Sequence, residues 1–354
     1  MIENIEAKVE KYHWLRQEED GSLSMFLDHH ALSSFRMCEA YFDLAIIQGR
    51  APKGGPSWPL AFGAVFHTAV EYLYKSKAIS KFDPEQLKEI AVREWHKAKL
   101  EQFNQHKTYI ALGGLPGFIA LIMQYVSYYS GDLERMRPIA TEVPFGKAKE
   151  VPLGEFSAFK QDFDFINMDF EINVKCYLTG RIDFLMDSGT AIGPMDHKTS
   201  AQFKNNPMNT YETQEGMTGY IFATNHIVRH NFPELTASRS LDRMWMNFIQ
   251  IKSEPDSNKR FRRVPLFKTP WQLEQYKARQ ISTFKKIFDL FVLEQGTPDW
   301  NTNVCNSWWY QECPFRRVHR QSSEQSMLIV LNSDYEVREP WDPEKIGGSE
   351  GGDD

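Results

Sequence analysis

The sequence predicts an α/β protein in which a mixed central sheet is flanked by helices and follows a mainly helical first third. Up to residue 137, apolar residues recur at helical spacing, most clearly in the run 62–73. From residue 139 onward, β-branched and aromatic residues dominate, with stretches of alternation that are typical of strands. The 354 residues are 42% hydrophobic, which is enough to bury a full core.

The predicted helices of the first third follow from their caps and their apolar stripes. A helix near residues 33–42 has Ser33 or Ser34 as its cap. The run Asp-Pro-Glu-Gln at 83–86 combines a capping carboxylate, proline at the first position and glutamine three residues after the cap. A third helix is expected from about 117 to 137. This region is therefore a helical insertion before the sheet.

The remaining elements alternate between strands and helices. We expect strands in 139–145, 163–186, 244–251, 263–267 and 327–337, and helices in 211–230 and 270–294. The chain then divides into a polar lead-in (1–30), a helical region (31–138), an α/β core (139–295), a segment with Cys and Trp (296–338) and an acidic, disordered tail (339–354).

Composition excludes several classes of protein. There is no apolar run of transmembrane length and no signal-peptide pattern at the N-terminus, so we expect a soluble, cytoplasmic protein without a membrane partner. Four unevenly spaced cysteines favour reduced thiols or metal ligands over a disulfide framework. The net charge of -6 argues against a protein that coats nucleic acid by bulk electrostatics, but it permits one basic groove.

The stretch from residue 177 to 200 carries the most informative polar residues. It is predicted to form two strands joined by a two-residue turn at Ser188 and Gly189, a register that places Asp183 opposite Pro194. Because side chains alternate between the faces of a strand, Asp183, Asp196 and Lys198 project to the same side. Two carboxylates about 7–8 Å apart across a strand pair can reach one hard cation.

This arrangement suits phosphodiester hydrolysis, which needs charge neutralisation, an activated water and a stabilised leaving oxygen. Carboxylates that hold Mg²⁺ or Mn²⁺ meet these needs, and a neighbouring lysine can orient the water. The alternative is that the charged residues lie on an ordinary exposed sheet face. The apolar residues beside them on both strands favour a buried sheet, in which an unpaired aspartate is costly.

Two runs, Gly180-Arg-Ile-Asp183 and Asp196-His-Lys-Thr199, resemble motifs II and III of the PD-(D/E)XK nuclease superfamily, and of its RecB-like exonuclease branch in particular, including phage and CRISPR-associated members. The resemblance implies a restriction-endonuclease-like core with a helical insertion. The run Gly63-Ala-Val-Phe-His67 matches the Gly-x-x-x-His helix of that branch. Together, these resemblances imply that His67, Asp183, Asp196 and the His197 carbonyl hold a divalent ion and that Lys198 is the catalytic lysine. Taken alone, His67 would be read as an ordinary helix-edge histidine.

Other site residues are implied by the same resemblance. Tyr220 corresponds to a tyrosine that contacts DNA or braces the site, but the position four before it is Gly216, and the nearest glutamine is Gln214. Arg181 is carried over as a supporting residue. Glu142 resembles an acidic residue of the first core strand, and an exposed strand carboxylate explains it equally well.

The cysteines have two interpretations. The resemblance implies an iron–sulfur cluster, or zinc, held by Cys38, Cys305, Cys313 and, in place of a fourth cysteine, His319. Alternatively, Cys38 belongs to an apolar helix stripe and Cys176 is a small buried hydrophobic residue.

The function implied by the resemblance is a metal-dependent DNA nuclease, expected to be an exonuclease, that acts in recombination, repair or phage DNA metabolism. The implied partners are DNA and a recombination or replication protein. The alternatives are a non-cleaving DNA-binding module of the same fold and a hydrolase of small phosphoesters. A groove for DNA would draw on basic residues, with Trp308 or Trp309 for base stacking: Lys259, Arg260, Arg262, Arg263, Arg316, Arg317 and Arg320.

Overall fold

The computed structural model describes residues 2–55, 57–160, 170–203, 211–305, 312–339 and 341–343. The chain forms two compact units, which are described separately. Unit 1 comprises Met1–Gly55, Pro144–Arg181 and Trp271–Asp354, and unit 2 comprises Pro56–Val143 and Ile182–Pro270. Among the described residues, no helix is both long and apolar enough to cross a membrane.

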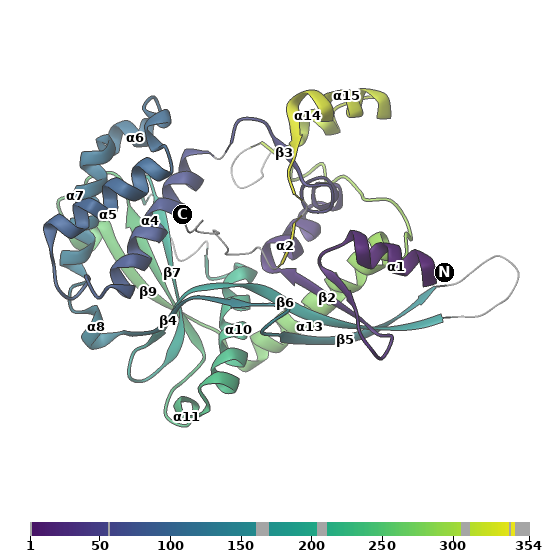
Figure 1. Cartoon of the computed structure of the whole chain (residues 1–354), viewed down its shortest axis with the longest axis horizontal. Helices are drawn as coiled ribbons and strands as arrows, with labels where there is room; N and C mark the ends of the chain where they lie inside the picture. Colours follow the sequence, from purple (N-terminus) through teal and green to yellow (C-terminus); the bar gives the residue numbers. More distant parts are fainter. Residues whose placement is uncertain are drawn as a thin grey trace, which may run out of the picture. The chain divides into compact units, whose positions relative to one another are not determined.

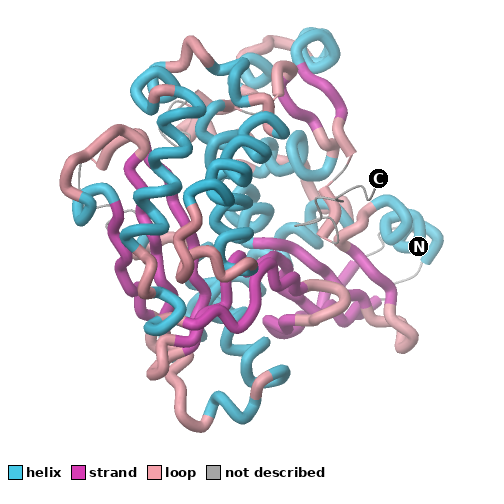
Figure 2. The backbone as a smooth tube through the Cα atoms, turned by 60° about the vertical axis from the view of Figure 1, so that its left-hand side comes forward, coloured by secondary structure: helices cyan, strands magenta, loops and turns pink. Residues whose placement is uncertain are grey.

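Unit 2 begins with the helical insertion. Its helices are α4 (Trp58–Lys75), α5 (Pro84–Lys97), η2 (Leu100–Phe103), α6 (Lys107–Leu112), α7 (Gly114–Tyr128) and α8 (Asp132–Arg135). The cap expected for α5 is confirmed, because the Asp83 carboxylate accepts hydrogen bonds from the amides of Glu85 and Gln86. These helices lie together beside strands β7 and β9 in Figure 1, and Figure 2 gives a second view of the backbone with helices in cyan and strands in magenta.

The strands of unit 2 form a mixed sheet. They are β4 (Arg137–Phe145), the end of β6 (Phe170–Asp187), β7 (Ile192–Ser200), β8 (Arg243–Gln250) and β9 (Phe261–Phe267). Strand β7 runs antiparallel to β6 and parallel to β8, and β8 runs antiparallel to β9. Helices α10 (Glu215–Asn231), α11 (Pro233–Thr236) and α12 (Ser257–Arg260) complete the unit, and α10 contacts both β7 and β8.

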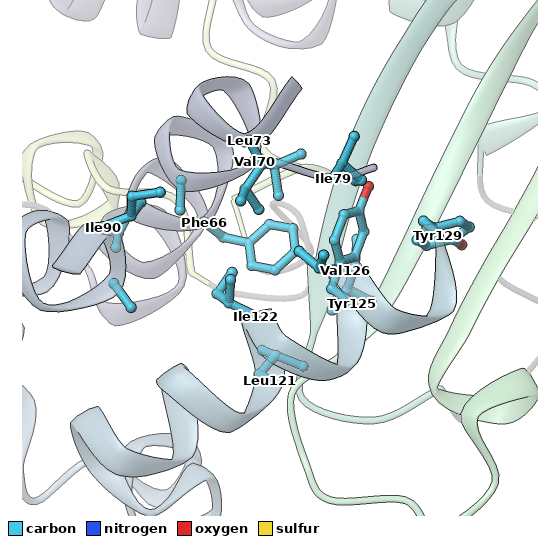
Figure 3. Packing of buried hydrophobic residues seen from close by; sticks show 14 of the residues in the cluster. Phe66, Val70, Leu73, Ile79, Ile90, Leu121, Ile122, Tyr125, Val126 and Tyr129 are labelled. Carbon is cyan, nitrogen blue, oxygen red and sulfur yellow. The ribbon is translucent and has the colours of Figure 1, made fainter. Parts of the chain in front are cut away.

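The core of unit 2 lies between α4, α5, α7 and the sheet. Phe66 on α4 is fully buried, and its ring meets that of Tyr125 on α7 edge to face, with centroids 5.7 Å apart. Figure 3 shows Val70 and Leu73, further along α4, facing Ile122 and Val126 of α7. The core residues of α4 recur at helical spacing, which is why the sequence pattern located this helix.

The hairpin register differs from the expected one by two residues. Phe184 pairs with Met195 and Asp187 with Ile192, so the connection is longer than two residues. The reason is local: the Gly189 amide donates a 2.7 Å hydrogen bond to the Asp187 carboxylate, which stabilises a turn longer than two residues. A shift of two residues preserves the side-chain alternation.

Unit 1 contains a second set of strands and helices. They are α1 (Ile2–Lys11), β1 (Leu15–Gln17), β2 (Leu23–Asp28), α2 (His29–Met37), α3 (Glu39–Phe42), η1 (Asp43–Ile47), β3 (Arg50–Pro52), β5 (Val151–Lys160), the first part of β6, α13 (Pro270–Ile287), η3 (Phe288–Val292), α14 (Arg316–His319), α15 (Glu324–Asp334) and β10 (Tyr335–Val337). Strand β6 lies between β2, which is parallel to it, and β5, which is antiparallel.

Three expectations for unit 1 need correction. The polar lead-in contains β2, whose six residues are all buried in the sheet. The helix expected near 33–42 is divided into α2 and α3 at Cys38, and α2 begins earlier than expected. Asp28 caps α2 by accepting a 2.6 Å hydrogen bond from the Ala31 amide, so the cap is neither of the predicted serines. The late strand is mostly helix α15, because Ser323 and Ser326 form a capping box that starts a helix there.

Some expectations lie outside the described residues. They concern the start of the strand expected at 163–186, Trp308 and Trp309, and the tail from residue 344 onward.

Candidate metal centre

Strand β7 presents two different faces. The His197 ring is 1% exposed and meets the Phe184 ring of β6 edge to face at 5.1 Å, so these two side chains share the core face. By alternation, Asp183, Asp196 and Lys198 occupy the opposite face. The local pattern of apolar and polar residues therefore sorts the charged groups to one side of the hairpin.

The structure brings His67, Asp183 and Asp196 together. One ligand atom from each lies within 4.8 Å of the others. Helix α4 carries His67, whose Nδ1 is 3.1 Å from Oδ2 of Asp183 and whose Nε2 is 2.6 Å from the carbonyl oxygen of His197. An imidazole nitrogen, two carboxylates and a carbonyl form a donor set that suits a small divalent cation such as Mg²⁺ or Mn²⁺.

The protonation of His67 follows from these neighbours. Burial alone would lower the pKa of His67, but the hydrogen bond and charge of Asp183, with a contribution from Asp196, raise the pKa above its ordinary value. Asp183 and the His197 carbonyl thus lie against the two ring nitrogens of His67.

Lys198 forms an ion pair within the same group. Its Nζ lies 2.7 Å from Oδ2 of Asp196, a carboxylate whose residue is 5% exposed. Burial favours the neutral amine, but the charge and hydrogen bond of Asp196 raise the pKa of Lys198 above its ordinary value. The ammonium is therefore held beside the candidate metal ligands as a charged donor.

Sequence reasoning missed Tyr211. It precedes α10, and its ring packs against Phe248 with centroids 5.4 Å apart. Burial raises the pKa of Tyr211, Lys198 lowers it and Asp196 raises it, so the phenol lies within the field of both groups. No motif in the sequence singles out this residue; only the folded arrangement places it there.

Sequence reasoning also missed a buried polar network behind β7. Nε2 of His197 is 2.9 Å from Nδ2 of Asn247, whose Oδ1 accepts a 2.6 Å hydrogen bond from Arg263. Arg263 in turn forms a two-pronged ion pair with Asp132, at 2.8 and 2.6 Å. Burial, followed by the positive charges of His67, Arg263 and Lys198, lowers the pKa of His197 well below its ordinary value.

The supporting residues occupy varied places. Gln214 is the N-cap residue of α10 and makes no side-chain cap hydrogen bond, and Tyr220 is a half-buried residue further along the helix. Arg181 is half-buried on β6, two residues before Asp183. Glu142 has a φ of 50° within β4, an unusual backbone conformation for a residue other than glycine.

The cysteine cluster is in unit 1. Cys38, Cys305 and Cys313 are all buried in one apolar cluster, and Sγ of Cys305 lies 3.2 Å from Nδ1 of His319. Burial, with smaller contributions from the other two thiols, raises the pKa of Cys313 to about 11. Cys176 lies apart from this cluster on β6 as a free, buried thiol.

Two of the basic residues expected in a DNA groove have structural roles instead. Arg260 is 4% exposed and donates to the carbonyl oxygens of Gln250 and Ile251. Arg263 belongs to the network behind β7. Both side chains are directed inward because a buried backbone carbonyl or carboxylate needs a donor. Trp308 and Trp309 lie outside the described residues.

Comparison with known proteins gives two findings. A family model described as the PD-(D/E)XK nuclease superfamily matches residues 28–318. Among solved structures, a crystal structure named "Putative exonuclease" from Eubacterium rectale is 14% identical, with a TM-score of 0.40, and the alignment covers 84% of this chain and 89% of that one. Among curated proteins, none matches the sequence. The mixed sheet flanked by helices is consistent with the restriction-endonuclease-like fold, and the chain belongs to the PD-(D/E)XK nuclease superfamily.

Proposed function

We propose that this protein is a divalent-metal-dependent deoxyribonuclease, acting as an exonuclease, in which His67, Asp183, Asp196 and the His197 carbonyl hold Mg²⁺ or Mn²⁺. The observation that carries the proposal is the convergence of the His67, Asp183 and Asp196 donor atoms within 4.8 Å, beside the Lys198 ammonium. Family membership supports nuclease chemistry.

Each residue has a distinct role in the proposed reaction. A divalent ion at this site would neutralise phosphate charge and promote deprotonation of the attacking water. Asp196 holds the Lys198 ammonium beside the candidate metal ligands through their 2.7 Å ion pair, where it would orient the attacking water. Nδ1 of His67 and Oδ2 of Asp183, which lie 3.1 Å apart, would both serve as ligands of the ion.

We assign the chain to the RecB-like branch of the superfamily, and a role in recombination, repair or phage DNA metabolism follows from that assignment. Its support is the helix that carries Gly63 and His67 ahead of the sheet, together with Tyr220 on the helix after it. The substitution of Gly216 at the glutamine position is the departure from that pattern.

We further propose that Cys38, Cys305, Cys313 and His319 hold an iron–sulfur cluster or zinc in unit 1. Its support is that the three thiols lie in one buried apolar cluster and that Sγ of Cys305 lies 3.2 Å from Nδ1 of His319, since thiols and imidazole are the donor types that such groups bind. Protein purified without oxygen and assayed for iron, sulfide and zinc tests this proposal; a metal-free protein whose Cys313→Ser variant folds and cleaves normally would refute it.

The main test is cleavage of end-labelled single- and double-stranded DNA with Mg²⁺ or Mn²⁺. We expect Asp183→Ala and Lys198→Ala to lower the cleavage rate at least ~100-fold. Lys252→Ala, which changes an exposed lysine after β8, is the matched control and should cleave at the wild-type rate.

The outcomes separate the alternatives. Metal-dependent loss of label from one end establishes an exonuclease and its polarity. DNA binding without cleavage by the wild type favours the non-cleaving binding module. Hydrolysis of a small chromogenic phosphodiester, with none on DNA, favours a small-molecule hydrolase.

A further inference from the structure

The face of β7 directed into the core has a polar anchor that the proposed reaction does not use. The His197 ring is buried there, and its Nε2 lies 2.8 Å from the Tyr125 hydroxyl and 2.9 Å from Nδ2 of Asn247. Tyr125 is on α7 and Asn247 is on β8. Two separate elements therefore hold one ring on the side opposite the candidate metal ligands.

The orientation of this anchor is fixed step by step from Asp132. The two terminal nitrogens of Arg263 each donate a hydrogen bond to one carboxylate oxygen of Asp132, and this pair of bonds fixes the plane of the guanidinium. The Nε of Arg263 then donates to Oδ1 of Asn247 at 2.6 Å. Because an arginine nitrogen can only donate, the Asn247 oxygen must face it.

The orientation of Asn247 in turn fixes that of His197. With its oxygen turned to Arg263, Asn247 presents its NH₂ group to Nε2 of His197, which must therefore accept. The neutral ring then carries its proton on Nδ1. The side chains of Asn247, Tyr125 and His197 are each no more than 1% exposed, so water does not compete for these hydrogen bonds.

The anchored residue is also the one whose backbone enters the candidate metal centre. The carbonyl oxygen of His197 lies 2.6 Å from Nε2 of His67, and Asp196 and Lys198 flank it in the chain. A ring held at its tip restricts rotation of the peptide units on either side. An apolar side chain would fill the same space without fixing that rotation.

We infer that Asn247, Arg263, Asp132 and Tyr125 are positioning residues for the metal centre, which hold the His197 peptide so that its carbonyl and the Asp196 carboxylate face a divalent cation. This inference rests on the proposed function, because it assumes that the site binds a metal. Groups that hold a metal-ligating residue in place typically change metal affinity about 10- to 100-fold when they are removed.

The test measures Mn²⁺ binding by isothermal titration calorimetry on the full chain, with no DNA present. Asn247→Leu removes both the donor to His197 and the acceptor for Arg263. Tyr125→Phe removes a single hydroxyl and keeps the ring. Val126→Ala is the matched control, because it opens a cavity in the same helix and core without touching the network.

We expect Asn247→Leu to raise the dissociation constant for Mn²⁺ about 10-fold or more. Tyr125→Phe should raise it less, and Val126→Ala should leave it within about 2-fold while lowering thermal stability. Unchanged affinity in a folded Asn247→Leu protein would overturn the inference. If that variant does not fold, unchanged affinity in Tyr125→Phe overturns it instead.

The design also separates this inference from the proposed function. A wild type that binds Mn²⁺ but cleaves no DNA refutes the nuclease, while the loss of affinity in Asn247→Leu still supports the positioning role. A wild type that binds no Mn²⁺ refutes both.

Discussion

Removing one partner of the ion pair between Arg263 and Asp132 should cost more stability than breaking an exposed pair such as that of Lys88 and Glu85. The side chains of Arg263 and Asp132 are only 14% and 8% exposed, and two hydrogen bonds join them. Asp132→Asn preserves the shape but leaves the guanidinium without a counter-charge. Removing one partner of a buried pair lowers the free energy of unfolding by about 3–5 kcal/mol. The amide oxygen of the substituted side chain can still accept one hydrogen bond from Arg263, so we expect a loss of about 3 kcal/mol for Asp132→Asn.

The double variant Asp132→Asn with Arg263→Met tests the origin of that loss. The double variant removes the buried charge altogether. We therefore expect the summed stability losses of Asp132→Asn and Arg263→Met to exceed the loss of the double variant by at least ~1 kcal/mol. Urea unfolding monitored by tryptophan fluorescence gives the three free energies. Lys88→Gln is the control, because it breaks the exposed pair with Glu85 and should cost less than ~0.5 kcal/mol. If Asp132→Asn costs no more than Lys88→Gln, the argument from burial is refuted.

Three further predictions follow from the same structure. Mn²⁺ at 100 times its dissociation constant should stabilise the wild type by about 2.7 kcal/mol in thermal unfolding, and equal stabilisation of Asp183→Asn would contradict the ligand assignment. Burial opposes ionisation of Asp187, but the Gly189 amide and Arg239 lower the pKa of Asp187 below its ordinary 3.8. The ionised carboxylate therefore adds to the free energy of unfolding in full above pH 3.8, and this contribution is lost as the pH falls through the folded-state pKa. The stability difference between wild type and Asp187→Asn should therefore shrink on acidification below pH 3.8, and a constant difference from pH 7 to 2 would exclude this cause. Phe66→Ala, at a fully buried position of α4, should cost about 3–5 kcal/mol in urea unfolding, and a loss below ~1 kcal/mol would show that the core collapses around it.

The parts of the site that depend on alternation could be predicted from the sequence. The placement of Asp183, Asp196 and Lys198 on one face requires only period-two geometry and an antiparallel hairpin. It holds although the register differs by two residues, since an even shift leaves every side chain on its face. The helical stripe around Phe66 located α4 for a similar reason, since periodicity is a local property of the chain.

The network behind β7 could not be predicted in this way. Arg263 and Asp132 are separated by 131 positions and meet only through the packing of β9 against the helical insertion. In the sequence, Arg263 belongs to a basic run that has the pattern of an exposed patch. The buried strand β2 was missed because its six residues have no alternation, and two short polar segments enclose it. Long-range pairing, rather than local pattern, makes it a strand.

The alternation along β7 limits how this protein can change during evolution. Substitutions on either face can be absorbed one at a time, because each affects one environment. The loss or gain of a single residue between Ile192 and Asp196 would exchange the two environments at once, placing the His197 imidazole on the face of the candidate metal ligands and two charged groups in the apolar interior. Variation in length should therefore accumulate in the turn before β7, whereas the strand itself accepts changes of side chain alone.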